Sequence, residues 1–254
     1  MIKKILYKLL DIVTGGKGIP RNFGGHTVKM PTAYFRYFPK DYEKENFNFI
    51  NSELKEGMTV LDIGAHIGLM AVVFGKKVGN TGKVYAFEPT PTTVNILRHT
   101  IRINKSENIS VEPYALADQK GKLTFYISDN LVDNGNSLVN NQRTDRKERG
   151  IEVDVNTVDD FVMEKGVGKI DFIKIDVEGA ELRLLRGAQH TLRKDKPKVI
   201  LSIHPASIRN FGDSSSEIWE LVNDMGYKVM FDSLEIKEET FLSKDDLFDV
   251  FLVQ

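Results

Sequence analysis

Four side chains that can exchange protons or hold a cation lie where two apolar runs of the chain end. Lys174, Asp176 and Glu178 stand in or directly after one run, and His204 directly follows the next. A histidine with the ordinary pKa of about 6.5 can accept a proton from a hydroxyl group. A lysine inside an apolar run needs an ion-pair partner, which Asp176 offers on the same strand face. We predict a proton-transfer site of these four residues, with a structural ion pair at Lys174 and a helix N-terminal acid at Glu178 as the alternative.

The same residues leave a metal site open. Asp176, Glu178 and His204 together offer oxygen and nitrogen ligands, and a divalent ion would acidify a bound hydroxyl group. The chain has no dense carboxylate cluster after the run that precedes His204. The sequence therefore favours a site without a metal.

A second group of residues indicates a site for a nucleotide-like cofactor. The apolar run at 58–63 contains Asp62, and Gly64 and Gly68 follow where a helical pattern begins. A strand, a tight turn and a helix N-terminus in this order form the cofactor-binding corner of a doubly wound α/β domain. A dinucleotide fingerprint has a glycine at the position of His66, where the pyrophosphate approaches the backbone.

The acid before the turn selects among cofactors. Asp62 would repel a phosphate, whereas it suits a cofactor with an ammonium group, a sulfonium group and no phosphate. We therefore predict S-adenosylmethionine, bound by Asp62, Gly64, Ala65, His66 and Gly68. A nicotinamide-dependent oxidoreductase is the alternative on a similar sheet, and the missing middle glycine argues against it.

The end of the next strand adds an acid to the predicted cofactor site. Glu88 directly follows the apolar run at 83–87, and Pro89 stops the strand there. A carboxylate at this place can accept hydrogen bonds from both ribose hydroxyls. The alternative is that Glu88 only caps the helix that begins near Pro91.

The third strand of the pattern, at 109–114, leads to Ala117 and Asp118. In a nucleotide-binding fold this position often contacts the adenine, and the Asp118 carboxylate could accept from the exocyclic amine. The alternative is that Asp118 only begins the turn at 118–121.

The elements that position these residues alternate between strands and helices, which predicts an α/β protein with a doubly wound, seven-stranded, mostly parallel sheet. Between the third and fourth strands, residues 122–128 alternate as a hairpin strand does, and 129–150 form a long polar loop. The expected strands are 58–63, 83–87, 109–114, 170–176, 198–203, 227–232 and 248–253, and the expected helices are 41–55, 66–77, 92–104, 178–194 and 216–225.

The N-terminal part precedes this alternation. Residues 1–14 read as a short basic amphipathic helix, which Lys8 and Asp11 make too charged to span a bilayer. We expect this helix to pack on the domain or on a second copy, with weak contact to the inner face of a membrane as the alternative. We expect residues 1–50 to form an extension of helix and loop, and 51–254 the cofactor-binding domain of a cytoplasmic protein.

Composition limits the partners. The 254 residues carry a net charge of −1, which gives no global electrostatic attraction to nucleic acid. No cysteine is present, so disulfides, thiolate metal sites and cysteine nucleophiles are excluded.

Three segments of the chain, Val60–Gly68, Phe87–Pro91 and Phe172–Glu181, resemble the FkbM-type methyltransferases. The third segment is the most specific, and the resemblance extends over about 55–205. It implies a class I fold, S-adenosylmethionine as the methyl donor, and transfer to an oxygen of a sugar or natural product. It also implies cofactor contacts from Asp62, Gly64, Gly68 and Glu88, and an active-site floor of Asp176 and Glu178.

The residues at the end of the strand at 170–176 narrow the chemical class of the methyl acceptor. Methylation of an amino group of adenine or cytosine usually relies on an Asn/Asp-Pro-Pro-aromatic turn here, where this chain has Asp176-Val-Glu-Gly. Methylation of cytosine C5 needs a cysteine. We therefore expect in-line methyl transfer to a hydroxyl of a small molecule or glycan, with His204 removing the proton. The alternative class is a catalytically inactive cofactor-binding module that acts through its N-terminal helix.

Overall fold

The central sheet has the form that the alternation of strands and helices predicts. The structure, a computed structural model, describes residue 10, residues 12–128 and residues 148–254. Five strands pair in parallel, and the C-terminal strand runs antiparallel between two others. The strands are β3 (Thr59–Ile63), β4 (Lys83–Phe87), β5 (Ile109–Glu112), β9 (Phe172–Ile175), β10 (Lys198–Ile203), β11 (Lys228–Phe231), β12 (Leu234–Glu235) and β13 (Phe248–Val253).

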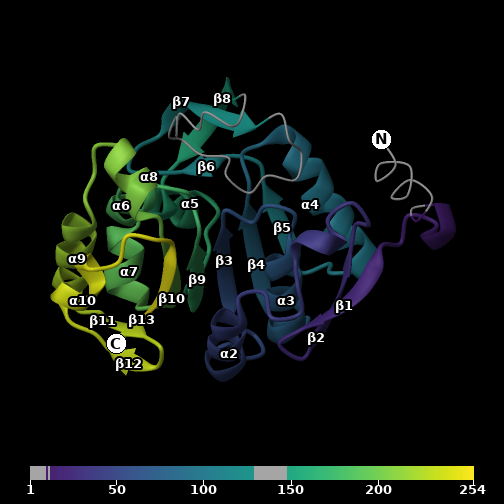
Figure 1. Cartoon of the computed structure of the whole chain (residues 1–254), viewed down its shortest axis with the longest axis horizontal. Helices are drawn as coiled ribbons and strands as arrows, with labels where there is room; N and C mark the ends of the chain where they lie inside the picture. Colours follow the sequence, from purple (N-terminus) through teal and green to yellow (C-terminus); the bar gives the residue numbers. More distant parts are fainter. Residues whose placement is uncertain (1–9, 11, 129–147) are drawn as a thin grey trace.

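These strands lie in the order β12-β11-β13-β10-β9-β3-β4-β5 (Figure 1). The chain winds outward from β3 to β4 and β5 on one side, and from β9 to β10 on the other. The prediction of a doubly wound, mostly parallel sheet is confirmed. All seven expected strands are present, and β12 is an addition of two residues, too short to show an apolar pattern.

Helices cover both faces of the sheet, because neighbouring residues of a strand point to opposite faces. Val60 and Leu61 of β3 accordingly belong to two different apolar clusters. One cluster includes side chains of α2 (Lys44–Glu53), α3 (Leu69–Val78) and α4 (Pro91–Asn104). The other includes side chains of α5 (Val158–Glu164), α6 (Glu181–Arg186), α7 (Gln189–Asp195), α8 (Pro205–Asn210), α9 (Ser215–Asp224) and α10 (Glu238–Leu242).

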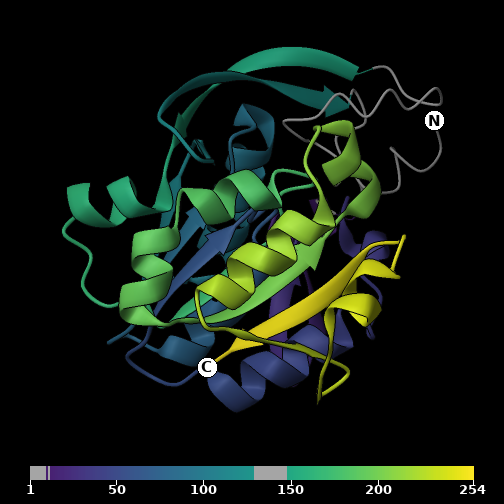
Figure 2. The same cartoon turned by 90° about the vertical axis from the view of Figure 1, so that its left-hand side faces the viewer.

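A second, smaller sheet contains a strand that the sequence analysis did not predict. The strands β6 (Ala115–Leu116), β7 (Gly121–Ser128) and β8 (Glu148–Asn156) lie in the order β6-β8-β7. The pattern that reveals β8 is present, since Ile151, Val153 and Val155 alternate with polar residues. In both views the β7–β8 pair stands at one end of the central sheet (Figures 1 and 2). The expected loop at 129–150 thus ends inside β8, and its part at 129–147 lies outside the described residues.

The two helices that follow β3 and β9 begin later than expected, because left-handed backbone precedes them. His66 and Gly68 have φ angles of 48° and 86° before α3, and Glu178 and Gly179 have φ angles of 53° and 112° before α6. Both turns lie at the carboxyl ends of central strands. The start of each helix is therefore set by a turn that also shapes this end of the sheet.

The expected single helix at 178–194 is divided into α6 and α7. The division falls at Gly187, whose added Cβ would lie 2.0 Å from the carbonyl oxygen of Ala117. The chain segment that leaves β6 approaches the helix so closely that only a glycine fits there.

The N-terminal part forms a hairpin and a helix. The hairpin consists of β1 (Ile19–Phe23) and β2 (His26–Met30), which pair antiparallel, and the short 3-10 helix η1 (Phe35–Tyr37) follows. The expected helix at 41–55 is present as α2, and the expected boundary after residue 50 falls inside it. Phe49 of α2 packs on Phe172 of β9 and Phe251 of β13, with ring centroids 5.8 and 4.5 Å apart. The helix predicted at 1–14 lies mostly outside the described residues.

Within residues 10, 12–128 and 148–254, no helix combines the length and the apolar character that crossing a bilayer would require.

We predict that Gly187→Ala lowers the free energy of unfolding by roughly 1–3 kcal/mol, because the added methyl group would overlap the carbonyl oxygen of Ala117. Urea unfolding followed by circular dichroism measures this change. Gly168→Ala is the matched control, since nothing lies within 4 Å of a Cβ at that position. Equal stability of both variants would contradict the close approach.

Candidate functional site

A cavity of about 330 Å³ opens at the carboxyl ends of β3, β9 and β10. The strand order reverses between β3 and β9, which is where open α/β sheets bind their ligands. All four residues predicted to carry out proton transfer line this cavity: Lys174, Asp176, Glu178 and His204. Of the residues predicted to bind the cofactor, Asp62, Gly64, Ala65, His66, Glu88, Pro89 and Asp176 line it.

The turn after β3 lies directly against the end of β9. Gly64 has a φ of 84°, and an added Cβ would lie 1.8 Å from the carbonyl oxygen of Asp176. The backbone N–H of Asp176 also donates to the carbonyl oxygen of Ile63 at 3.0 Å. The predicted cofactor turn and the predicted reaction site are therefore joined through the backbone.

Asp62 is a buried carboxylate in the lining of the cavity. Its side chain is 1% exposed, and neither oxygen has a well-formed hydrogen bond among the described residues. Burial raises the pKa of Asp62 to about 7, although the positive charge of Lys174 opposes the shift. A buried acid without a hydrogen bond is costly, so this position fits the ammonium group of a bound cofactor.

Glu88 lines the cavity and also caps a helix. Its Oε1 accepts from the backbone N–H of Thr90 at 2.9 Å, and Thr90 is the N-cap residue of α4. Burial raises the pKa of Glu88 to about 7, against the opposing effect of this hydrogen bond. Glu88 therefore caps α4, and this cap fixes the carboxylate at the wall of the cavity, where the predicted contact with ribose hydroxyls would form.

Three residues predicted to bind the cofactor do not line the cavity. An added Cβ at Gly68 would lie 2.4 Å from Cδ1 of Leu97, so this glycine is needed for packing on α4. Ala117 is buried beside Gly187, and Asp118 is exposed. The strand β6 pairs with β8 and leads the chain away from the cavity, and the adenine contact of Ala117 and Asp118 stays a prediction. The wall after β5 consists instead of Tyr114, Ala115, Leu116 and, from β7, Phe125.

Lys174 and Asp176 form the ion pair that their spacing predicts. The Lys174 Nζ donates to Oδ2 of Asp176 at 2.9 Å. Burial alone would lower the pKa of Lys174, but the charges of Asp176, Glu43 and Asp62 raise it above the ordinary value. Burial would likewise raise the pKa of Asp176, but Lys174 and His204 hold it below the ordinary value. Both groups are charged at neutral pH.

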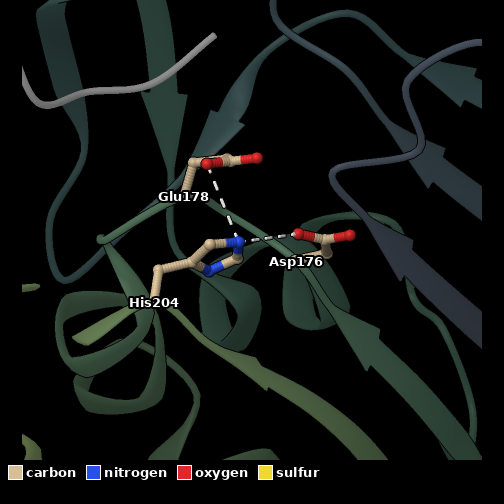
Figure 3. A group of neighbouring side chains, drawn as sticks. All are labelled: Asp176, Glu178 and His204. Atoms are coloured by element: carbon tan, nitrogen blue, oxygen red, sulfur yellow. Dashed lines mark ion pairs between the residues drawn. The ribbon is translucent and has the colours of Figure 1, made fainter. Parts of the chain in front are cut away.

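His204 stands among three carboxylates at the end of β10. Its Nδ1 lies 2.7 Å from Oε1 of Glu181, and its Nε2 lies 3.7 Å from both Asp176 Oδ1 and Glu178 Oε2 (Figure 3). Burial alone would lower the pKa of His204, but these carboxylates, Glu181 foremost, raise it to about 9. The ordinary value that the sequence analysis assumed is therefore wrong for this environment.

Glu181 is a residue of this site that the sequence analysis did not single out. Its side chain is fully buried, and its Oε1 also accepts from the backbone N–H of Gly179 at 3.0 Å. The sequence signal for Glu181 is its position at the end of Phe172–Glu181, the segment that resembles the FkbM-type methyltransferases. It was missed because an acid in the first turn of a helix has an ordinary structural explanation.

Another wall of the cavity is formed by the residues around α2 together with β13 and the residue before it. Asn46 of α2 donates to Glu43 Oε2 at 2.9 Å and to Asp249 Oδ2 at 2.8 Å. Ser202 donates to the other oxygen of Asp249 at 2.5 Å. Glu43, Ser202 and Asp249 line the cavity together with Phe38, Tyr42 and Leu247. No local pattern predicts this wall, since Asn46 and Asp249 are 203 residues apart in sequence.

The fold and the cavity define a class I S-adenosylmethionine-dependent methyltransferase. A family model described as the methyltransferase FkbM domain matches residues 62–229. The chain belongs to this family, which sets aside the nicotinamide-dependent alternative and agrees with the resemblance of the three segments.

Two named relatives and one solved structure are similar to this chain. The 31-O-demethyl-FK506 methyltransferase FkbM of Streptomyces tacrolimicus is 27% identical over 70% of this chain and 75% of its own length. The hexuronic acid methyltransferase AglP of Haloferax volcanii is 28% identical over 70% of this chain and 69% of its own length. A solved FkbM methyltransferase from Methylobacillus flagellatus aligns with 77% of this chain and 43% of its own chain, with a TM-score of 0.49 and 18% identity.

We predict that Asp62→Asn stabilises the ligand-free protein above pH 7. Between pH 4 and 7 the folded state holds a proton on Asp62 that the unfolded state has released, so wild-type stability falls as pH rises through this range. Removing the charge should add roughly 2–4 kcal/mol at pH 8, since one pKa unit corresponds to about 1.4 kcal/mol. At pH 4 the difference should vanish.

Urea unfolding of both proteins at pH 4, 6 and 8 measures this change. The variant should also lose affinity for S-adenosylmethionine, which calorimetry at pH 8 measures. A variant that is equally destabilised at every pH would contradict a buried charge at Asp62.

Proposed function

We propose that this methyltransferase transfers the methyl group to a hydroxyl of a sugar or of another small molecule rich in hydroxyls. The observation that carries the proposal is a single cavity that contains the cofactor acids, Asp62 and Glu88, and also the group around His204. A cofactor and an acceptor held in one cavity can meet in the orientation that methyl transfer needs.

The described residues can hold S-adenosylmethionine at the β3 and β4 ends of the cavity. Asp62 would accept from its ammonium group, and Glu88 from the ribose hydroxyls. The rings of Tyr114 and Phe125 would border the adenine with apolar surface. When bound, the cofactor supplies a methyl group on a positively charged sulfur, a good leaving group for attack in line.

The wall that contains Glu43 and Asp249 supports an acceptor rich in hydroxyls. Carboxylates accept hydrogen bonds and cannot donate them when ionised, so Glu43, Glu178 and Asp249 match the hydroxyl groups of a sugar. Phe38 and Leu247 add apolar surface at the same wall, as a sugar ring or a macrocycle would need. The names of two relatives, one for a hexuronic acid and one for the 31-O position of a natural product, support the same acceptor class.

The residues at the ends of β9 and β10 would remove the hydroxyl proton, and His204 would accept it in its neutral form, which is the minor form at neutral pH because its pKa is about 9. His204, Asp176 and Glu178 surround one point of the cavity, and Lys174 keeps Asp176 in place. Alignment of the acceptor oxygen contributes more to the rate than proton removal, since well-oriented reactants reach effective molarities of about 10⁵ M or more.

Acceptor screening tests the reaction class. The purified chain with S-adenosylmethionine should methylate members of a panel of neutral sugars, uronic acids and natural-product alcohols. Mass spectrometry of the acceptor and release of S-adenosylhomocysteine measure the transfer. Products methylated at nitrogen or carbon, with none methylated at oxygen, would overturn the proposal.

We predict that His204→Gln lowers kcat about 10²- to 10⁴-fold on an acceptor found in this screen, because a proton-transfer group typically contributes this much. The affinity for S-adenosylmethionine should change little, which isolates the reaction end of the cavity. His190→Gln on the exposed face of α7 is the matched control and should keep full activity. Full activity of His204→Gln would remove this residue from the reaction.

A further inference from the structure

We propose that Asp176, Glu178 and His204 bind one divalent metal ion in the cavity. The role that we give this ion depends on the proposed O-methylation, whereas its binding does not. The three side chains come from the ends of β9 and β10 and converge on one point (Figure 3). One ligand atom from each lies within 4.8 Å of the other two.

The distances fit an ion better than they fit direct contacts. His204 Nε2 lies 3.7 Å from Asp176 Oδ1 and 3.7 Å from Glu178 Oε2. Hydrogen bonds of this kind are about 2.7–3.2 Å long, so the imidazole is hydrogen-bonded to neither oxygen. Metal–ligand bonds of about 2.0–2.2 Å place two ligands of one ion at most roughly 4.4 Å apart. Both separations can therefore be bridged by a single ion.

A buried carboxylate behind the histidine is an independent indication. Glu181 is fully buried, lies 2.7 Å from Nδ1 of His204 and is itself held by the backbone N–H of Gly179. Histidines that bind metals characteristically donate their second ring N–H to a carboxylate, which fixes the tautomer and directs the other nitrogen to the ion. Here that other nitrogen, Nε2, faces the cavity.

The contacts of Asp176 and the charge of the lining support the same arrangement. Lys174 binds Oδ2 of Asp176 at 2.9 Å, which leaves Oδ1 directed to the histidine. Asp62, one strand away, lines the same cavity with neither oxygen in a well-formed hydrogen bond. The lining contains six acids but only one lysine, Lys174, and two histidines. This excess of acids favours the binding of a cation. The six acids are Glu43, Asp62, Glu88, Asp176, Glu178 and Asp249.

The ligand set indicates the class of ion. One imidazole nitrogen and two carboxylates suit a first-row divalent ion such as Mn²⁺ or Zn²⁺, since Ca²⁺ takes six to eight oxygen ligands. Three protein ligands leave coordination positions open, as catalytic metal sites do. The sequence analysis named the same three ligands and did not favour a metal because no dense carboxylate cluster follows β10.

An ion at this place would change how the acceptor loses its proton. A hydroxyl bound beside the ion would have a lowered pKa, so its proton leaves to bulk water while His204 remains a ligand. The oxygen then bonds to the methyl carbon as the carbon–sulfur bond breaks. The group that we assign to proton removal would thus act through the ion.

Metal binding by the full chain, without cofactor or acceptor, tests the site. The protein is stripped with EDTA, dialysed, and titrated with MnCl₂ under electron paramagnetic resonance and with ZnCl₂ in a calorimeter. We expect one ion per chain, and affinity at least tenfold lower in Glu178→Gln and in Asp176→Asn. Asp118→Asn, which alters an exposed acid outside the cavity, should bind as the wild type does. Thermal unfolding checks that each variant is folded.

Two results would overturn the metal site: no stoichiometric binding of either ion, or binding that Glu178→Gln and Asp176→Asn leave unchanged. The screen for O-methylation is read separately. Methylation at full rate in EDTA would retain the proposed function and reject the role that we give the ion in proton removal. Stoichiometric binding that these variants weaken would retain the ion even if no hydroxyl acceptor is methylated.

Discussion

The positive charge of Lys174, buried in the central strand β9, is the constraint on which the site depends. This side chain is 3% exposed, and it stabilises the charges of Asp176, Glu43 and Asp62, which come from three different parts of the chain. A buried charge without partners is strongly destabilising, so Lys174 requires acids beside it, above all Asp176, whereas burial still raises the pKa of Asp62 and of Glu43. Their mutual attraction holds the end of β3, the end of β9 and the residue before α2 around one cavity.

The central sheet and most of its strand ends could be predicted from the sequence, because an apolar run followed by a polar residue is a local signal. Asp62, Glu88, Asp176 and His204 all lie at such ends, and all line the cavity. Ala117 and Asp118 do not line the cavity, because the pairing of β6 with β8 depends on a strand that starts beyond a long polar segment. A contact set by distant strand pairing leaves no local pattern.

The environment of His204 shows a second limit of sequence reasoning. Its position was foreseen, but its pKa and its partners depend on Glu181 and Glu178, which the strand-turn-helix geometry brings around the ring. The wall formed by Glu43 and Asp249 was not foreseen for a related reason, since it joins segments from opposite ends of the chain. Residue types show which chemistry is available, whereas three-dimensional contacts decide how a given group behaves.

The bridge that Asn46 makes between Glu43 and Asp249 has a consequence for how such enzymes diversify. The cofactor corner is built from the β3–α3 turn and the end of β4, whereas the wall that we assign to the acceptor is built from the N-terminal segment and the last strand. Substitutions at Leu247 or Asp249 would therefore alter the acceptor wall directly, whereas substitutions in the N-terminal segment would also reach the cofactor corner, because the ring of Phe38 lies 6.4 Å from that of His66. In evolutionary terms, a new acceptor would be acquired with the least change to the donor half through the last strand and the residues before it.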